Sequence, residues 1–178
     1  MSVSGNSTVG GIVGGIDTGD FGLLSVRNSH SSGDVQARDG DYVGGILGYA
    51  SQSSNGTVQF DKVYASGDIG SEFGSEVGGL IGSSIVGTYI YDSYANADVF
   101  GDQFVGGIGG VLLGAQINNV YAAGSVNGID GTVGGLMGAL NSGALSNSFS
   151  AVNVLTDGGS AAALIGAVQA SNVTRSNL

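Results

Sequence analysis

A six-residue motif that returns six times along the chain constrains its fold more than any other feature. The first copy reads Val-Gly-Gly-Ile-Val-Gly at residues 9–14, and later copies begin at Val43, Val77, Val105, Val133 and Ala161. Successive copies start 34, 34, 28, 28 and 28 residues apart. Self-similarity at such a period is the signature of a repeat architecture. Residues 1–178 are therefore predicted to form one repeat domain.

The composition favours strands for this repeat. Glycine supplies 36 of the 178 residues and proline none, and each glycine inside a helix costs about 1 kcal/mol relative to alanine. A 28-residue step holds three strands of five or six residues and three turns. We predict an all-β fold, a single β-solenoid of about six coils with 28–34 residues and three short strands per coil. The two longer steps predict loops around residues 17–21, 38–41 and 51–56, at one end of the rod.

Equivalent residues of successive coils stack into columns, and two kinds of column are predicted to be structural. Apolar residues repeat at the core positions Val35, Ile69, Val99, Val126 and Val154, together with Leu80, Leu136 and Leu164. Polar residues repeat at the turn positions Asn28, Lys62, Asp92, Asn119 and Asn147. The glycine pairs of the hexapeptide are expected to allow close backbone approach or a positive φ at a corner.

An aromatic column is the first candidate functional feature. Its members are His30, Tyr64, Tyr94, Tyr121 and Phe149. Alternation from the valine column directs these rings outward, but a turn at Gly33, Gly67 or Gly124 would reset the phase. The usual place of aromatic residues in strands favours the interior. If the rings face outward, Tyr64, Tyr94 and Tyr121 form a ligand face for sugar rings or a partner protein.

Aspartates suggest a second candidate feature. Asp34, Asp68 and Asp98 stack about 4.8 Å apart and are expected to be solvated or to share a cation. Asp17 with Asp20, and Asp39 with Asp41, could supply oxygen ligands to calcium. Neither pair matches an EF-hand or the nonapeptide calcium repeat. No cofactor is therefore expected, with calcium as the weakly supported exception.

The repeat also resembles a known family, the GLUG-motif repeat. The resemblance rests on Gly-Leu-Ile-Gly at residues 79–82, on Gly-Leu-Met-Gly at residues 135–138, and on the following blocks similar to Asn-Ser-Tyr-Ala-x-Gly. It implies a β-helical stem of the kind found in bacterial surface adhesins and in non-catalytic parts of immunoglobulin A peptidases. The end coils depart from the pattern, with His30 at an aromatic position and Ala162 and Ala163 replacing the glycine pair.

Charge and composition exclude several classes of binding partner and indicate a location. Fourteen acidic against four basic residues give a net charge of −10, which repels nucleic acid. Apolar runs fall far short of the roughly 18–20 residues that cross a bilayer, so no membrane insertion is expected. The absence of cysteine removes disulfides and thiolate sites. We expect an extracellular or cell-surface location, with the chain an internal fragment of a larger exported protein.

The leading functional hypothesis is a non-enzymatic adhesin or stalk, a rigid acidic rod that presents loops or a lateral face to a host or cell-surface protein or glycan. A polysaccharide-active β-helix enzyme is the first alternative. Elimination chemistry is poorly supported, because the chain holds one histidine and four cations. Ice binding, the second alternative, requires an outward threonine array, and the threonines form no full column. Uncapped strand edges predict end-to-end self-association.

Overall fold

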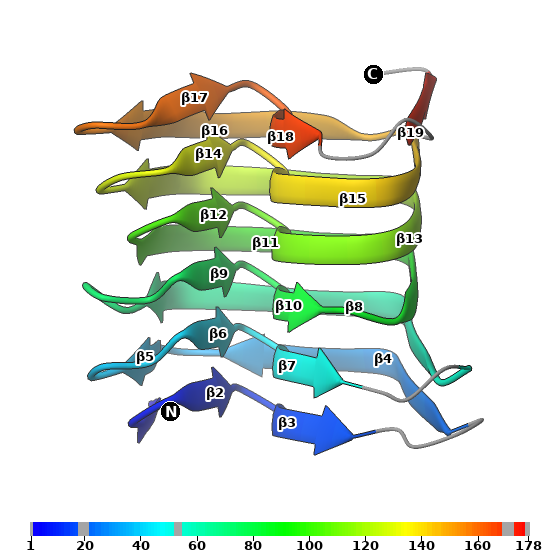
Figure 1. The fold of residues 1–178 in the computed structure, drawn as a ribbon. Coiled ribbons are helices and arrows are strands. Elements are labelled where there is room, and N and C mark those ends of the chain that lie inside the picture. Colours follow the sequence, from blue (N-terminus) through cyan, green and yellow to red (C-terminus); the bar gives the residue numbers. More distant parts are fainter. Residues whose placement is uncertain (1, 18–21, 52–54, 169–172, 177–178) are drawn as a thin grey trace.

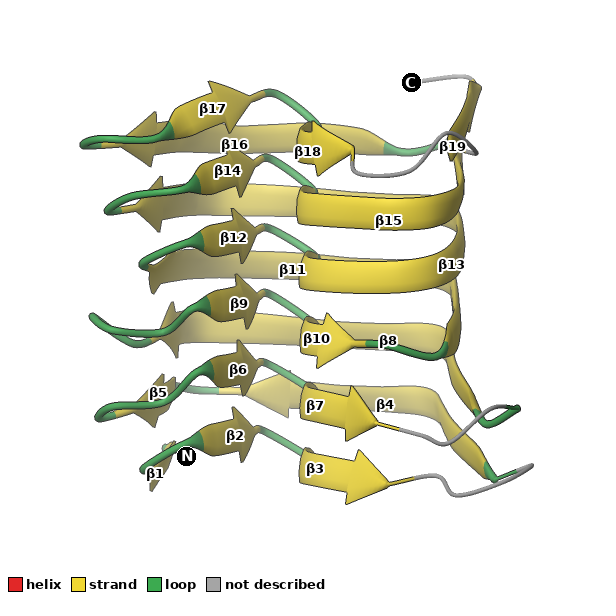
Figure 2. Ribbon diagram, viewed as in Figure 1, coloured by secondary structure: helices red, strands yellow, loops and turns green. Residues whose placement is uncertain are grey.

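The protein is an all-β solenoid of six stacked coils, as the repeat predicts. The coils wind in a right-handed sense, which the sequence did not predict (Figure 1). The computed structural model describes residues 2–17, 22–51, 55–168 and 173–176. Within these residues there is no helix, and therefore none that could span a bilayer (Figure 2). Every strand pairing among the described residues is parallel and joins equivalent residues of neighbouring coils, so the repeat in sequence is a repeat in space.

The front wall of each coil is built by the hexapeptide and the residues around it. A six-stranded sheet contains β2 (Thr8–Gly10), β6 (Tyr42–Gly44), β9 (Glu76–Gly78), β12 (Phe104–Gly106), β14 (Thr132–Gly134) and β17 (Ser160–Ala162). A bend then leads into β3 (Val13–Asp17), β7 (Leu47–Ser51), β10 (Ile81–Ser84), β18 (Ile165–Val168) or the first part of a longer strand. The front wall is thus two short strands divided by one bend.

The side and back walls belong to one 13-stranded sheet, which also includes β3, β7, β10 and β18 of the front wall. It contains β1 (Val3–Gly5), β4 (Leu23–Ser32), β5 (Val35–Ala37), β8 (Thr57–Gly70), β11 (Gly87–Gly101), β13 (Gly109–Gly128), β15 (Met137–Ser146), β16 (Phe149–Thr156) and β19 (Val173–Ser176). The strand β13 passes along all three walls of its coil, turning at Gly114 (φ 65°) and Asn119 (φ 55°). A coil therefore has three walls, one of them bent.

The polar column marks the corner between the side and back walls. Asn28, Lys62, Asp92, Asn119 and Asn147 all have a positive φ of 48–55°. Asparagine and aspartate tolerate this left-handed conformation better than most residues. Part of the column is also a side-chain ladder, since Asn119 Nδ2 donates to Asp92 Oδ1 at 2.7 Å. The prediction that these are turn residues is confirmed.

The core follows the valine column. Val35 pairs with Ile69, Ile69 with Val99, and Val99 with Val126, and all four side chains are buried. Leu80 and Leu136 are also buried, as predicted. Val154 and Leu164 belong to the last coil and are only partly buried. Each interior coil is therefore covered by the coils on both sides, whereas the described residues cover the last coil on one side only.

The glycine pairs serve close approach, not a positive φ. A Cβ at Gly44, the first glycine of its pair, would lie inside van der Waals contact of the Leu47 carbonyl oxygen across the bend. A Cβ at Gly79, the second glycine of the next pair, would overlap the Gly107 carbonyl oxygen of the neighbouring coil. The positive-φ glycines lie elsewhere, at positions such as Gly67 and Gly124.

The longer N-terminal coils carry their extra residues at two corners. Ala50 pairs with Ser84 and Thr57 with Gly87, so the chain has six residues (51–56) between these pairings where the next coil has two (85–86). The other corner lies between the back and front walls and is called the turn edge below. There Gly70 pairs with Phe100 and Glu76 with Phe104, so residues 71–75 stand opposite residues 101–103. This second insertion was predicted in the preceding coil, at residues 38–41, but not at residues 71–75. Of the predicted loops, residues 18–21 and 52–54 lie outside the described residues.

Candidate binding surfaces of the solenoid

The aromatic column lies on the outer surface of the back wall. Tyr64 is half-buried between the buried residues Val63 and Ala65, and the alternation continues to exposed Asp68 and buried Ile69. Gly67 lies between Tyr64 and Asp68 and adopts φ 113°, but the residues on either side of it keep the same alternation of inward and outward side chains. The expectation of an interior column was wrong, because the glycine does not interrupt the pleat.

The rings stack on one another along the rod. Ring centroids are 6.1 Å apart for His30 and Tyr64, 4.7 Å for Tyr64 and Tyr94, 4.7 Å for Tyr94 and Tyr121, and 5.2 Å for Tyr121 and Phe149. The Tyr94 and Tyr121 planes differ by 7°. Stacking uses the faces of the rings, so the three tyrosines present mainly edges and hydroxyl groups outward. This reduces their value as stacking platforms for sugars.

The acidic column runs beside the aromatic column. Asp34, Asp68 and Asp98 are exposed, as expected for solvated carboxylates. Asp34 Oδ1 accepts a hydrogen bond from the Asp68 amide at 3.2 Å, and Asp98 Oδ1 accepts one from Ser125 Oγ at 2.7 Å. Neighbouring coils thus supply donors to this column.

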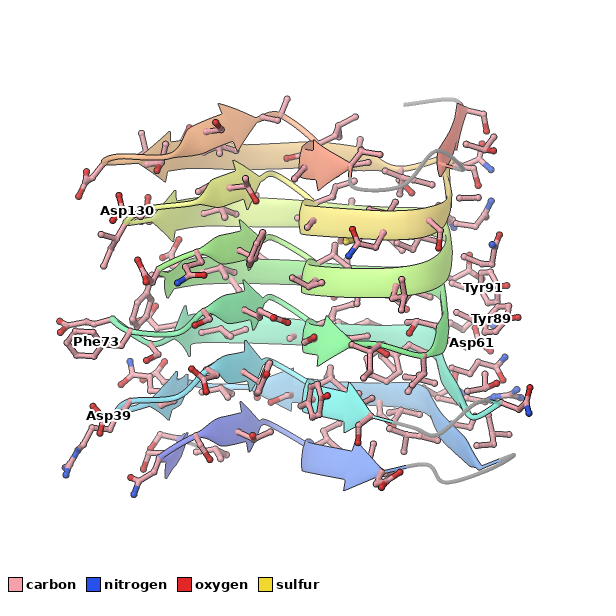
Figure 3. The ribbon with its side chains drawn as sticks, viewed as in Figure 1. Asp39, Asp61, Phe73, Tyr89, Tyr91 and Asp130 are labelled. Atoms are coloured by element: carbon pink, nitrogen blue, oxygen red, sulfur yellow. The ribbon has the colours of Figure 1, made fainter. Side chains whose placement is uncertain are left out.

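The described calcium candidates lie at different edges of the solenoid. Asp17 ends β3 on the side-wall end of the front wall, whereas Asp39 and Asp41 lie in the loop between β5 and β6 at the turn edge, where Figure 3 labels Asp39. Asp20 lies outside the described residues. Among the residues that the structure describes, no three of His, Cys, Asp or Glu gather in a metal-binding group. Calcium binding remains an untested prediction.

A pair of tyrosines that the sequence reasoning did not select stands on the side wall. Tyr89 and Tyr91 flank buried Ile90 on β11 and project outward together with Asp61 (Figure 3). Their ring centroids are 6.3 Å apart and the planes are tilted by 47°. Partial burial raises the pKa of the Tyr91 phenol, and the nearby Tyr89 phenol raises it further by a smaller amount. The sequence could have predicted this pair, because Ile90 aligns with core residues of the other coils and strand alternation directs both of its neighbours outward.

Glu76 is the second residue that the sequence reasoning missed. It lies in β9, where one carboxylate oxygen, Oε2, is buried without a hydrogen-bond partner. The buried Ser83 hydroxyl lies beside the carboxylate without completing a hydrogen bond. Burial and the nearby charge of Asp41 raise the pKa of Glu76, and the Ser83 hydroxyl partly opposes this shift. No motif marks this glutamate in the sequence.

The turn edge carries three adjoining clefts, of about 460, 340 and 360 Å³. The first two share residues 36–38, and the second and third share Glu72 and Phe100. Apolar side chains are exposed along this edge at Phe73, Ile129 and Leu155. The predicted loop at residues 38–41 therefore borders a lateral surface with apolar and acidic groups.

Comparison with known proteins identifies the architecture but not a family. No protein-family profile matches the chain, and no curated protein is similar to it. A solved structure does match: a candidate immunoglobulin A1 protease from Bacteroides ovatus, with a TM-score of 0.73 and 23% identity. The two proteins share the solenoid fold. The match covers 99% of this chain and 56% of the Bacteroides protein, so the solenoid spans about half the length of that neighbour.

Proposed function

We propose that the solenoid is a rigid, non-enzymatic module of an extracellular or cell-surface protein, acting as a stalk or adhesin. The observation that carries the proposal is the unbroken register of six coils. Backbone hydrogen bonds repeat through the stack, from the Ile46 amide to the Leu80 carbonyl and from the Leu80 amide to the Ile108 carbonyl. Such a stack keeps surface columns at fixed spacing along one axis.

Two likenesses support this proposal. The residues at 79–82 and 135–138 resemble the GLUG motif, whose repeats occur in adhesins and in stems of immunoglobulin A peptidases. The fold is similar to that of the Bacteroides protein, a longer chain named as a candidate immunoglobulin A1 protease. Both fit a solenoid that supports or displays a function within a larger protein.

Polysaccharide cleavage is a second candidate function, because one observation favours it. The pKa of Glu76 is raised by burial, and a general acid needs a carboxyl group that holds its proton at higher pH. Hydrolysis also needs a second carboxyl group across the bound sugar. Asp41, which raises the Glu76 pKa by its charge, is the candidate for that role.

One set of assays separates these functions. The purified chain is applied to glycan and host-matrix arrays with calcium or with chelator, and is incubated with neutral and acidic polysaccharides while reducing ends and unsaturated products are measured. We expect no cleavage. Array binding indicates an adhesin, and a silent array with no cleavage indicates a stalk. Cleavage that Glu76→Gln abolishes would overturn the non-enzymatic proposal.

A further inference from the structure

We propose that the outer side wall around Tyr89 and Tyr91 is a binding site for neutral oligosaccharides. The proposal rests on the adhesin form of the proposed function and assigns its ligand class. The site, called the side-wall site below, comprises the outward residues of four coils: Arg27, Gln59, Asp61, Tyr89, Tyr91, Gln116 and Asn118.

The accessibility of the rings is the first argument. Tyr89 is 37% exposed and Tyr91 is partly buried, so Tyr89 is the more accessible of the two rings. Its partners in the neighbouring coils are Gln59 and Gln116, and those of Tyr91 are Asp61 and Asn118. No aromatic ring therefore stacks above or below this pair, in contrast to the back-wall ladder. The accessible part of the Tyr89 ring can pack against the C–H face of a sugar.

The polar groups around the rings are the second argument. Gln59, Gln116 and Asn118 carry amides with donor and acceptor atoms, and Asp61 adds acceptors. A sugar presents hydroxyl groups that both donate and accept, and this mixture satisfies them. Two of the amides are already oriented: Gln59 Oε1 accepts from Arg27 Nη2 at 3.1 Å, and Asn118 Nδ2 donates to Ser146 Oγ at 2.7 Å.

Charge and rigidity select the ligand class further. Arg27 and Asp61 carry opposite charges in adjacent coils and offset one another, although the chain as a whole carries a net charge of −10. A neutral glycan therefore fits the side-wall site better than an acidic or a basic polymer. The inward neighbours Phe60, Ile90 and Ile117 are buried, so the wall is held in place before a ligand binds.

Fluorine NMR can test the site directly. The chain has seven tyrosines, and labelling with 3-fluorotyrosine gives each a signal that Tyr→Phe variants assign. The probes are cellohexaose, chitohexaose, xylohexaose and mannohexaose, with a heparin hexasaccharide as the acidic comparison. We expect at least one neutral probe to shift the Tyr89 and Tyr91 signals, and the heparin probe to leave them unchanged.

Variants identify the groups responsible. For the binding probe, we expect Tyr89→Ala with Tyr91→Ala to weaken affinity at least tenfold, and Gln116→Ala at least threefold. The matched control, Tyr64→Phe with Tyr94→Phe and Tyr121→Phe, keeps the ladder rings and should change affinity less than twofold. Circular dichroism confirms that each variant remains folded.

Three results would overturn the side-wall site: shifts confined to the ladder tyrosines, unchanged affinity in the Tyr89 and Tyr91 variant, or no shift with any neutral probe. None of these contradicts a stalk or an adhesin with another ligand. The broader proposal fails instead on polysaccharide cleavage, so the two failures are distinguishable.

Discussion

Glu76 shows how the environment of one side chain couples proton binding to stability. Its buried Oε2 has no hydrogen-bond partner, and desolvation disfavours the charged form. Asp41, one coil away, adds like-charge repulsion. The folded protein therefore binds the Glu76 proton more tightly than the unfolded chain does.

The replacement Glu76→Gln tests this coupling. Below the ordinary pKa of 4.5, glutamate is protonated in both states. As the pH rises from 4.5 through the raised folded pKa, the unfolded chain ionises first and the free energy of unfolding falls. We expect Glu76→Gln to be more stable than wild type at pH 7 and to lose this advantage near pH 4, measured by urea unfolding. Glu72→Gln, in the exposed turn loop, is the control, and an equal gain at both pH values would contradict this account.

Gly78 tests the close approach within the hexapeptide. A Cβ at this position would overlap the Ile81 carbonyl oxygen and the Gly109 Cα, both of which belong to the backbone. We expect Gly78→Ala to lower the free energy of unfolding by about 1–3 kcal/mol. In Gly87→Ala, the new methyl group would find its nearest neighbour at 3.8 Å. Chemical unfolding should show little change for this control, and equal losses would refute the packing argument.

At the scale of the element, the back-wall ladder should stabilise the stack. Tyr94 has a ring on each side at 4.7 Å, and an aromatic contact contributes about 0.5–1.5 kcal/mol. We expect Tyr94→Ala to cost about 1–3 kcal/mol in thermal or urea unfolding, and Tyr94→Phe far less. Tyr89→Ala, on the same strand but outside the ladder, should cost less than Tyr94→Ala. If the stacked rings do not stabilise the fold, Tyr94→Ala and Tyr89→Ala should lower the free energy of unfolding equally.

The columns of strands and turns could be predicted because each is repeated and therefore visible in the sequence. The Val35–Ile69–Val99 core column and the turn positions Asn28, Lys62 and Asp92 follow from position alone, whereas the left-handed conformation of the turn residues was not predicted. The direction in which the Tyr64 column faces could not be predicted, because a glycine with positive φ can either reset the pleat or leave it intact. That choice depends on pairing with the next coil.

The unrepeated features could not be predicted in the same way. Glu76 is replaced by Tyr42 and Phe104 in the adjacent coils, so no column draws attention to it. The insertion at residues 71–75 repeats the one predicted at residues 38–41, but it shares its 34-residue step with residues 51–56, to which all the extra length of that step can be assigned from the sequence. Sites that break the repeat require the structure to show what surrounds them.

At the scale of the whole molecule, the two ends of the rod remain the exposed parts of the core. In the last coil, Val152, Val154 and Ala161–Ala163 line an open cleft of about 360 Å³. A second copy could extend the stack by pairing its first coil with this edge, which would produce open-ended assembly.

The replacement Ala161→Lys tests this self-association. Ala161 pairs with the buried core residue Val133, so a lysine there would place a charge at the open end of the core. We expect sedimentation equilibrium to show concentration-dependent oligomers for the wild type and fewer for this variant. Asn153→Lys adds the same charge on the lateral face of the last coil and should leave assembly unchanged. A wild-type chain that stays monomeric at high concentration would disprove end-to-end pairing.

The orientation of the strands has a mechanical consequence. They run across the rod, so the hydrogen bonds between coils point along its axis. A pull between the two ends would load these bonds one coil at a time, and the chain would peel off in steps instead of yielding all at once. Each 28-residue coil that unfolds would lengthen the molecule by about 90 Å. A stiff rod could therefore absorb a sudden load by extending one coil at a time.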